Sequence, residues 1–152
     1  MMMILNGKKI FTLLLVLDEK NERVLLGKKR RGFGVGLFNG FGGKVEEEDH
    51  SVYESALREL EEEATIKALD CIEVGRITFD WIDEEDKCPW LVHVFRVTKF
   101  SGIPEMTEEM IPEWFSYDEI PFDRMWEGTM RASLSSRVIL FLYRFFYACM
   151  RG

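Results

Sequence analysis

Glu59, Glu62 and Glu63 have the residue type and spacing to hold a divalent cation. The segment reads Glu-Leu-Glu-Glu-Glu, so its acids crowd into little more than one helical turn. Glu59 and Glu63 are four residues apart and converge on one side of a helix, where like charges repel. A hard cation such as Mg²⁺ binds carboxylate oxygens and reverses that repulsion. The alternative is an ordinary solvated acidic face, and the helix alone does not decide between the two.

A helix over residues 51–64 must position these acids. Its first four residues, Ser-Val-Tyr-Glu, fit a capping box, which fixes where the helix starts. With about 100° per residue, one arc of the helix is predicted to face the core. That arc contains Tyr53, Ala56, Leu57, Leu60 and Ala64. Glu59 and Glu63 lie at its edges, whereas Glu61 projects to solvent. Arg58 can pair with a neighbouring glutamate and hold its rotamer.

A glycine-rich segment directly precedes this helix. Residues 31–44 contain six of the twelve glycines of the chain. The stretch "GFGGK" at residues 40–44 allows backbone groups to approach a ligand or metal closely. It is not a Walker A loop, because GxxxxGK[ST] is absent, and "GFGVG" at residues 32–36 is not a dinucleotide fingerprint, because no helix is expected to start there. A tight connection between a strand and a helix is the alternative interpretation.

The rest of the chain predicts strands around one core. Strands are expected at residues 10–17, 24–30, 72–82 and 91–100, with a short strand and turn at 112–122 and a last helix at 133–150. The first two strands form a predicted hairpin, because a short polar turn joins them. Strands with two helices that do not alternate regularly predict an α/β fold, a mixed β-sheet sandwiched between helices. A length of 152 residues fits a single domain.

Composition excludes several classes of function. The formal net charge of -7 argues against a nonspecific binder of nucleic-acid polymers, because such proteins neutralise phosphates with basic patches. No apolar stretch approaches the roughly 20 residues that a membrane-spanning helix needs. The three cysteines show no CxxC spacing, which favours buried thiols in a reducing cytosol over a metal site.

The segment from Gly43 to Ile66 resembles the Nudix box, GX5EX7REUXEEXGU, in which U is a bulky aliphatic residue. Residues 58–63 supply the complete REUXEE core, and Ile66 fills the final U. The flanking segments "KKRRGFGVGLFNGFGGKV", "VHVF", "EEMIPEWF" and "IPFDRMW" are similar to the animal MutT homologues, which hydrolyse oxidised purine nucleoside triphosphates. This similarity covers most of residues 10–126.

The resemblance implies Mg²⁺-dependent hydrolysis of purine nucleoside triphosphates such as 8-oxo-dGTP and 2-hydroxy-dATP. The products would be the monophosphate and pyrophosphate, and the reaction would cleanse the nucleotide pool and limit DNA damage. Mn²⁺ is an alternative cofactor. We expect a monomeric, cytoplasmic enzyme with a small-molecule substrate, and a nuclear or mitochondrial pool is also compatible. Two alternatives stay open: a Nudix hydrolase of a dinucleotide or nucleotide sugar, and a nucleotide-binding module without turnover.

The resemblance also assigns roles to individual acids. Glu59 and Glu63 are implied metal ligands, together with the carbonyl group of Gly42. Glu62 is implied either as a metal ligand or as the base that accepts a proton from water. Glu109 matches a further acid from a distant loop, again as ligand or base. An exposed loop charge is the alternative interpretation of Glu109.

The implied substrate contacts come from several segments. They are Thr12, Lys29, Phe33, Asn39, Phe41, Gly43, Lys44, Phe79, Trp126 and Glu127. Asn39 can present both a donor and an acceptor to a purine edge. Trp126 can stack on the base, and Phe33 and Phe79 would add apolar walls.

The chain departs from the family pattern at three places. The interval between the glycine and the arginine of the box is one residue too long, and either Glu48 or Asp49 can serve as its first acid. Thr65 replaces the last glycine, at a position where helices often end in a left-handed residue. Keeping that geometry with threonine should cost about 1 kcal/mol. The paired aspartates that follow the tryptophan in the family are absent, and Glu127 is the candidate substitute.

Overall fold

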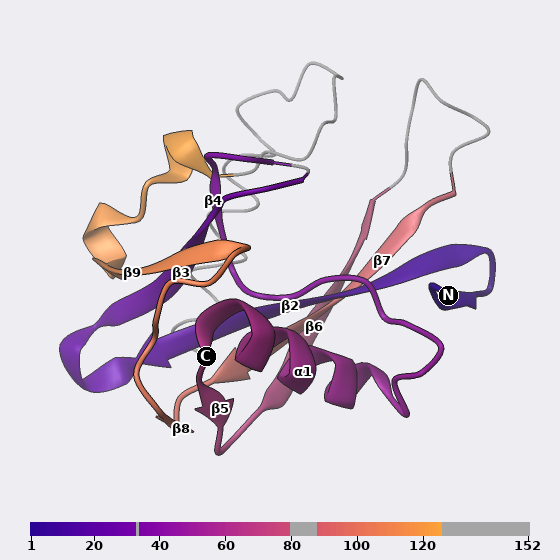
Figure 1. Ribbon diagram of the computed structural model, residues 1–152, viewed down its shortest axis with the longest axis horizontal. Helices are drawn as coiled ribbons and strands as arrows, with labels where there is room; N and C mark the ends of the chain where they lie inside the picture. The colour runs from indigo at the N-terminus through magenta and orange to yellow at the C-terminus, as the bar shows by residue number, and fades with distance from the viewer. Residues whose placement is uncertain (33, 80–87, 126–152) are drawn as a thin grey trace.

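The structure, a computed structural model, describes residues 1–32, 34–79 and 88–125, in which a mixed β-sheet carries a helix (Figure 1). The helix is α1, Val52–Ala64. The strands are β1 Ile4–Leu5, β2 Lys8–Asp18, β3 Arg23–Lys29, β4 Phe38–Asn39, β5 Lys67–Ala68, β6 Ile72–Phe79, β7 Trp90–Val97, β8 Phe100–Ser101 and β9 Met110–Ser116. Short 3₁₀ helices are η1 Glu19–Asn21, η2 Tyr117–Glu119 and η3 Phe122–Arg124. The helix expected at residues 133–150 lies outside the described residues.

Strand β2 forms the centre of the main sheet, whose order is β4-β3-β2-β7-β6. It pairs antiparallel with β3, with Val16 opposite Leu25, so the predicted hairpin is confirmed. On its other edge it pairs parallel with β7, with Leu14 opposite Phe95. Strands β6 and β9 add antiparallel partners to β7 and β3. The sheet is therefore mixed, and the predicted α/β fold is confirmed.

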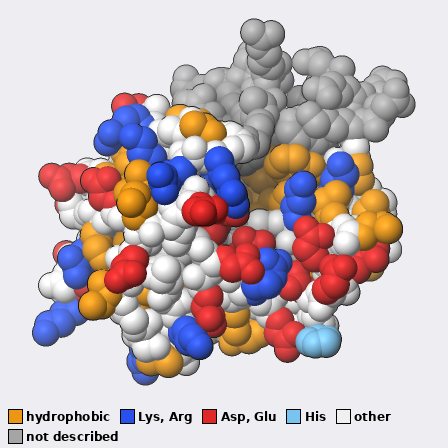
Figure 2. Space-filling model, viewed as in Figure 1, with side chains coloured by type: hydrophobic (Ala, Val, Ile, Leu, Met, Phe, Trp, Pro, Cys, Tyr) orange, Lys and Arg blue, Asp and Glu red, His pale blue; other side chains and the backbone are white. Residues whose placement is uncertain are grey.

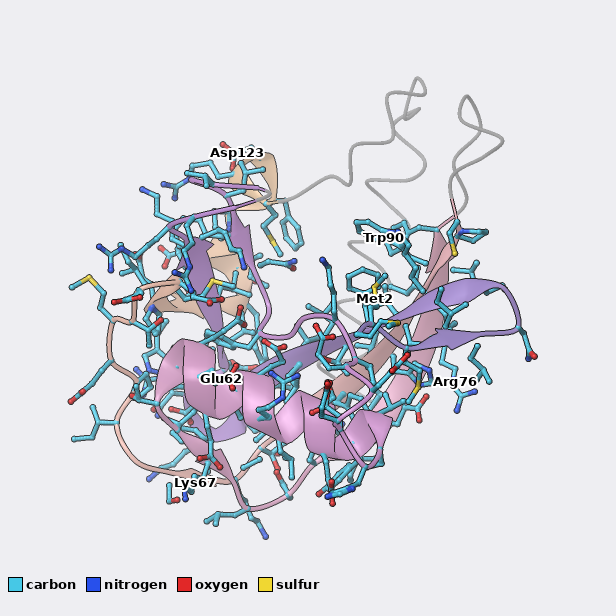
Figure 3. All side chains as sticks on the ribbon, turned by 45° about the vertical axis from the view of Figure 1, so that its right-hand side comes forward. Met2, Glu62, Lys67, Arg76, Trp90 and Asp123 are labelled. Carbon is cyan, nitrogen blue, oxygen red and sulfur yellow. The ribbon has the colours of Figure 1, made fainter. Side chains whose placement is uncertain are left out.

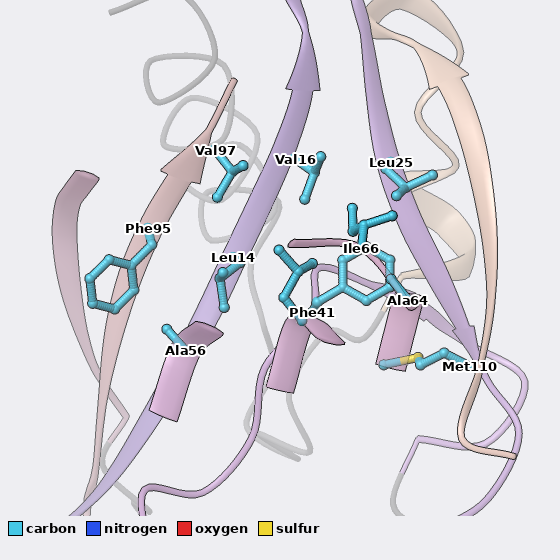
Figure 4. Packing of buried hydrophobic residues seen from close by; sticks show 11 residues of the cluster. Leu14, Val16, Leu25, Phe41, Ala56, Ala64, Ile66, Phe95, Val97 and Met110 are labelled. Carbon is cyan, nitrogen blue, oxygen red and sulfur yellow. The ribbon is translucent and has the colours of Figure 1, made fainter. Parts of the chain in front are cut away.

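Helix α1 packs on one face of this sheet through a buried apolar cluster. The cluster contains Leu14, Val16, Leu25, Phe41, Ala56, Leu60, Ala64, Ile66, Phe95, Val97 and Met110 (Figure 4). Complete burial of Leu60 stabilises the fold by about 2 kcal/mol relative to an exposed leucine. Tyr53 was expected in the core, but it is 44% exposed and meets Phe95 only by a ring edge. A tyrosine can pack its ring in this way while its hydroxyl stays in water.

The opposite face of the sheet carries a second apolar cluster. Its buried members are Leu15, Leu17, Val24, Leu26, Phe38, Ile120 and Met125. Successive side chains of a strand point to opposite faces, so β2 contributes to both clusters in alternation. Burial on both faces explains why β2 is continuously apolar from Leu13 to Leu17.

Helix α1 begins and ends as the sequence predicts. Ser51 is the N-cap, and its hydroxyl oxygen accepts the N–H of Glu54 at 3.1 Å. Thr65 follows the last helical residue in the left-handed conformation, with φ of 60°, and its N–H donates to the carbonyl of Glu61. The hydroxyl of Thr65 also donates to the carbonyl of Ile103 at 3.1 Å. This second bond offsets part of the cost of a left-handed threonine.

Two further expectations concern the membrane and the cysteines. Of the helices in the described ranges, α1 is the longest with 13 residues, and none could cross a membrane. Cys71 and Cys88 carry free thiols and are half-buried rather than fully buried. Burial raises the pKa of the Cys71 thiol to about 11, so this thiol stays protonated at neutral pH.

Candidate active site

The glycine segment at residues 40–44 runs beside β2 and forms the floor of the candidate site. The N–H of Thr12 donates to the carbonyl of Gly43 at 2.9 Å, and the N–H of Gly43 donates to the Thr12 hydroxyl at 3.3 Å. Only glycine suits position 42, where φ is 144° and a Cβ would lie 2.2 Å from the Thr12 carbonyl oxygen. The central strand of the sheet therefore fixes the position of this glycine backbone.

Glu63 points from α1 toward this backbone. Its side chain is 1% exposed, and its Oε2 accepts the N–H of Gly42 at 2.9 Å. Its Oε1 lies 3.6 Å from Nζ of Lys29. Burial raises the pKa of Glu63 to about 7, against the opposing effects of the Gly42 N–H and the Lys29 charge. This carboxylate is therefore short of compensating positive charge.

Glu59 lies one turn earlier on the helix and faces the next glycine. A Cβ on Gly43 would lie 2.6 Å from Oε1 of Glu59, so glycine at this position makes room for the carboxylate. Burial is also the main cause that raises the pKa of Glu59. Glu59 and Glu63 thus face adjacent glycines, and their predicted convergence is confirmed.

Arg58 joins these acids to the turn that precedes the helix. Its Nε and Nη2 donate to the two carboxylate oxygens of Asp49 at 2.9 and 3.0 Å, a bidentate pair. These hydrogen bonds lower the pKa of Asp49 to about 2. The Nη1 of Arg58 reaches Glu59 and Glu62, each at 3.1 Å. The predicted role of Arg58, to hold the rotamers of its acidic neighbours, is confirmed.

The bidentate pair also distinguishes the two candidates for the first acid of the box, Glu48 and Asp49. Asp49 contacts the arginine of the box, and its Oδ2 accepts the N–H of Glu46 at 2.9 Å, which closes the turn. Glu48 is 78% exposed and pairs only with the N-terminal amine among the described residues. Of the two candidates, Asp49 is therefore the acid that contacts the arginine of the box.

Glu61 and Glu62, the other two acids of the Glu59–Glu63 segment, are exposed. Glu62 is more than half exposed on the outer side of α1 (Figure 3) and keeps its contact with Arg58. Glu61 is exposed and lies 3.7 Å from Nζ of Lys67. The expectation that Glu61 is ordinary solvated surface is confirmed.

Glu109 reaches the same region from the loop before β9. Its carbonyl accepts the N–H of Arg30 at 2.8 Å, which places it beside the end of β3. Its carboxylate pairs with the guanidinium of Arg31. After the larger effect of burial, the negative charge of Glu109 further raises the pKa values of Glu59 and Glu63. Glu109 lies more than 40 residues beyond the helix in sequence, yet it is close enough in space to raise the pKa values of both glutamates.

Each carboxylate of the site is paired with a cation of the protein itself, and Figure 2 shows acidic and basic side chains interleaved over this face. The pairs are Arg58 with Glu59 and Glu62, Lys29 with Glu63, and Arg31 with Glu109. Within the described ranges, no three His, Cys, Asp or Glu side chains already form a metal centre. The donors nevertheless fit a hard divalent cation, because they offer carboxylate oxygens, two of them poorly compensated, beside the glycine backbone.

Of the predicted substrate contacts, Thr12 and Lys29 lie beside these acids and their glycines. Thr12 is buried against Gly43, and Lys29 is half-buried beside Glu63. Asn39 is half-buried on β4, and its Oδ1 accepts the N–H of Gly40 at 2.9 Å, which leaves its amide nitrogen free to donate elsewhere. Lys44 is exposed, and Phe79 is half-buried at the end of β6. Phe33, Trp126 and Glu127 lie outside the described residues.

Phe41 requires a correction. Its side chain is fully buried and packs among Leu14, Ala64 and other members of the cluster under α1 (Figure 4). The glycines on either side approach β2 closely, so the residue between them points into the interface of helix and sheet. A side chain in that position supports the site from below and has no surface left for a substrate.

Arg31 and Thr107 are functional candidates that no motif marked. Arg31 belongs to the basic run at residues 28–31, and a run of cations at the end of a strand is a signal for acidic partners. Thr107 donates to the carbonyl of Glu63 at 3.4 Å and accepts the N–H of Glu109 at 3.2 Å. Its contact with the helix spans 44 residues of sequence, so local patterns could not reveal it.

Similarity to known proteins identifies the family of this chain. A family model described as the NUDIX domain matches residues 8–134. The oxidized purine nucleoside triphosphate hydrolase of Danio rerio is 43% identical over 118 residues, which cover 78% of this chain and 72% of the relative. The protein of the same name from Mus musculus is 41% identical over 122 residues, which cover 80% and 75%.

Solved structures agree with this assignment at the level of the fold. The MutT protein of Bacillus halodurans superposes with a TM-score of 0.68 at 25% identity, covering 95% of this chain and 83% of that one. The MutT NUDIX hydrolase of Burkholderia pseudomallei gives 0.65 at 23% identity, covering 88% and 96%. From the matched domain, the sequence relatives and the box on α1, we conclude that this chain belongs to the Nudix family.

Proposed function

We propose that the protein hydrolyses oxidised purine nucleoside triphosphates, such as 8-oxo-dGTP and 2-hydroxy-dATP, to the monophosphate and pyrophosphate. The observation that carries this proposal is the buried, poorly compensated pair of Glu59 and Glu63 against Gly42 and Gly43. Such a pair suits a divalent cation that also binds phosphate oxygens. The relatives named as hydrolases of these nucleotides support the purine substrate.

We infer that Glu59, Glu63 and the carbonyl oxygen of Gly42 hold the metal, with Glu109 and Glu62 as further candidate ligands. A bound Mg²⁺, or Mn²⁺ in its place, would neutralise phosphate charge and lower the pKa of the attacking water. The other proposed contributions to the reaction come from side chains of the protein itself.

The side chains around the acids have distinct proposed tasks. Arg58 keeps Glu59 and Glu62 in place, since both accept from its Nη1. Lys29 adds positive charge beside the phosphates. The attacking water gives its proton to a carboxylate oxygen, and Glu62 and Glu109 are the two candidates because water can reach both.

We propose that the purine binds between β2, β4 and the end of β6. Thr12, Asn39 and Phe79 come from these strands, and Lys44 and Gly43 adjoin them. Phe33, Trp126 and Glu127 complete the proposed pocket. Asn39 would donate from its amide nitrogen, and its Oδ1, which already accepts the N–H of Gly40, has a second lone pair for the purine edge.

The proposed partner is a small nucleotide, bound by a monomer in the cytoplasm with access to nuclear or mitochondrial pools. The net charge of -7 opposes long polyanions, while the local cations Lys29, Arg30 and Arg31 can offset that field for a single triphosphate.

One assay tests the proposed function. Pyrophosphate release is measured with 8-oxo-dGTP, 2-hydroxy-dATP, dGTP and ADP-ribose, in Mg²⁺ and in chelator. We expect metal-dependent turnover that prefers the oxidised nucleotides. Equal rates on dGTP would contradict the sanitising role, and hydrolysis of ADP-ribose alone would favour the other class of Nudix substrate. Absence of any turnover would favour a binding module. The matched control is Glu61→Gln, which removes an acid of the same helix outside the site.

A further inference from the structure

Thr107 connects three parts of the molecule around the acidic site. Its hydroxyl donates to the carbonyl oxygen of Glu63, in the last turn of α1, at 3.4 Å. The same oxygen accepts the N–H groups of Glu109 at 3.2 Å and of Met110 at 3.1 Å. Its own N–H donates to the carbonyl of Met110 at 2.9 Å, and its carbonyl accepts from Nη1 of Arg30. Helix α1, the start of β9 and the residue that follows β3 therefore meet at Thr107.

The hydroxyl of Thr107 uses its full bonding capacity. A hydroxyl has one proton to donate and two lone pairs to accept with. The proton goes to the backbone of Glu63, and the lone pairs face the two N–H groups that follow in the loop. Neither a methyl group nor a hydrogen could replace any of these three bonds. The side chain thus ties the backbone of one acid of the site directly to the backbone of another.

Among the described residues, the other contacts of Glu109 do not tie its backbone or its carboxylate to the helix. Its carbonyl accepts the N–H of Arg30 at 2.8 Å, beside the end of β3. That carboxylate pairs with Arg31, whose side chain is exposed, and exposed ion pairs contribute little to holding a geometry. The loop is also attached earlier, where the N–H of Glu105 donates to the carbonyl of Ala64 at 3.3 Å. That attachment lies four residues before Glu109, whereas the Thr107 hydroxyl accepts the N–H of Glu109 itself.

We propose that Thr107 is a positioning residue whose hydroxyl sets the separation between Glu109 and the pair of Glu59 and Glu63. With this separation fixed, acids from the loop and from the helix can serve one divalent cation. The inference rests on the proposed metal-dependent hydrolysis and adds to it a residue that touches neither metal nor substrate.

The test compares two substitutions at one position. Thr107→Val keeps the branched shape and loses the hydroxyl, whereas Thr107→Ser keeps the hydroxyl and loses the methyl group. Each is made in the full chain, alone and with Glu109→Gln. Mn²⁺ binding without nucleotide is followed by the electron paramagnetic resonance signal of free Mn²⁺. Turnover of 8-oxo-dGTP and thermal unfolding are measured beside it.

We expect Thr107→Val to weaken Mn²⁺ binding and to lower kcat by about tenfold each, as changes to groups that orient ligands do. Thr107→Ser should stay within about twofold of the wild type, because all three hydrogen bonds remain. With Glu109→Gln already present, Thr107→Val should change Mn²⁺ binding by less than about twofold, because the two sites act as one unit.

Several results would overturn the proposal. They are an effect of Thr107→Val that is equally large with and without Glu109→Gln, a Thr107→Ser variant as impaired as Thr107→Val, and wild-type protein that binds no Mn²⁺. If Thr107→Val does not fold, Thr107→Ala replaces it and carries the same expectation. Mn²⁺ binding without hydrolysis of any nucleotide would refute the proposed function alone, since the binding test needs no turnover.

Discussion

The pKa values of two acids at opposite ends of α1, Asp49 and Glu63, are shifted in opposite directions. Before the helix, the side chain of Asp49 is 8% exposed and receives two charged hydrogen bonds from Arg58, and its pKa falls to about 2. In the last turn, the side chain of Glu63 is 1% exposed, with one backbone N–H and an amine 3.6 Å away, and its pKa rises to about 7. Little of either side chain is exposed, but within the described ranges only Asp49 has a bidentate guanidinium partner.

This difference separates a structural acid from a functional one. A carboxylate with a bidentate guanidinium has its charge satisfied inside the protein, so it stabilises the fold and attracts nothing else. A carboxylate buried without such a partner gains from any additional positive charge that reaches it. Burial alone therefore does not distinguish the two residues. They differ in their partners, because Asp49 has a bidentate guanidinium and, among the residues that the structure describes, Glu63 does not.

The largest expected effect follows from removing the charge of Glu63, which has no bidentate partner in the described part of the chain. Glu63→Gln should lower turnover by at least about 100-fold, since a metal ligand is lost. The fold should persist, because glutamine can still accept the N–H of Gly42 and no longer buries a charge. Pyrophosphate release and thermal unfolding measure the two effects. Activity retained in this variant would remove Glu63 from the ligand set.

Substitution of Asp49, the acid with the bidentate partner, should lower the stability of the fold more than it lowers turnover. Asp49→Asn should lower the free energy of unfolding by about 2 kcal/mol, because charged hydrogen bonds to Arg58 are lost. Glu48→Gln is the matched control and should stay within about 0.5 kcal/mol of the wild type. Urea denaturation of both variants gives the comparison. A larger loss in the Glu48 variant would reverse the assignment of the first acid of the box.

The pH dependence of stability should differ in sign between the two acids. In chelator, the folded pKa of Glu63 lies near 7, above its ordinary value of 4.5. The folded protein therefore binds more protons in that interval, and the contribution of Glu63 is lost as the pH rises through about 7. Asp49, lowered from 3.8 to about 2, contributes above its ordinary pKa and loses that contribution as the pH falls through about 2.

Melting curves across pH separate these contributions. The melting temperature of Glu63→Gln should gain on that of the wild type as the pH rises from about 4.5 to about 7. A constant difference over that range would mean that Glu63 titrates normally in the folded protein. Asp49→Asn should instead converge with the wild type only in strong acid.

The smallest expected effect concerns the strained end of the helix. Thr65→Gly should raise the free energy of unfolding by about 0.5 kcal/mol, because the relief of left-handed strain exceeds the loss of an exposed hydrogen bond. The kcat should not change, since the side chain of Thr65 points to Ile103 and away from the acids. Thr65→Ala keeps the strain, loses the bond and should be less stable than the wild type. Urea denaturation distinguishes the three proteins.

Local sequence was sufficient for the helix that carries the acids. The sequence predicts Ser51 as the N-cap and Thr65 as the left-handed residue at the end of the helix, because caps depend on residues within one turn. Arg58 was predictable for the same reason, since its acidic neighbours lie one and four residues away.

Long-range packing decided what local sequence could not. The choice between Glu48 and Asp49 depends on how the turn before α1 closes, and that closure uses a backbone N–H rather than a motif. Phe41 was misassigned because the approach of its flanking glycines to β2 directs it into the core. The contribution of Thr107 depends on a contact between a loop and a helix that are far apart in the chain.

The attachment of the glycine segment to β2 has a consequence for how this protein can evolve. The backbone at Gly42 and Gly43 moves only if the middle of the sheet moves, since it is bonded to Thr12. The proposed base contacts, such as Asn39 and Phe79, sit at strand ends instead. Substitutions there can change which nucleotide fits while the phosphate chemistry keeps its geometry. One lineage can therefore acquire new substrates without having to reinvent its reaction.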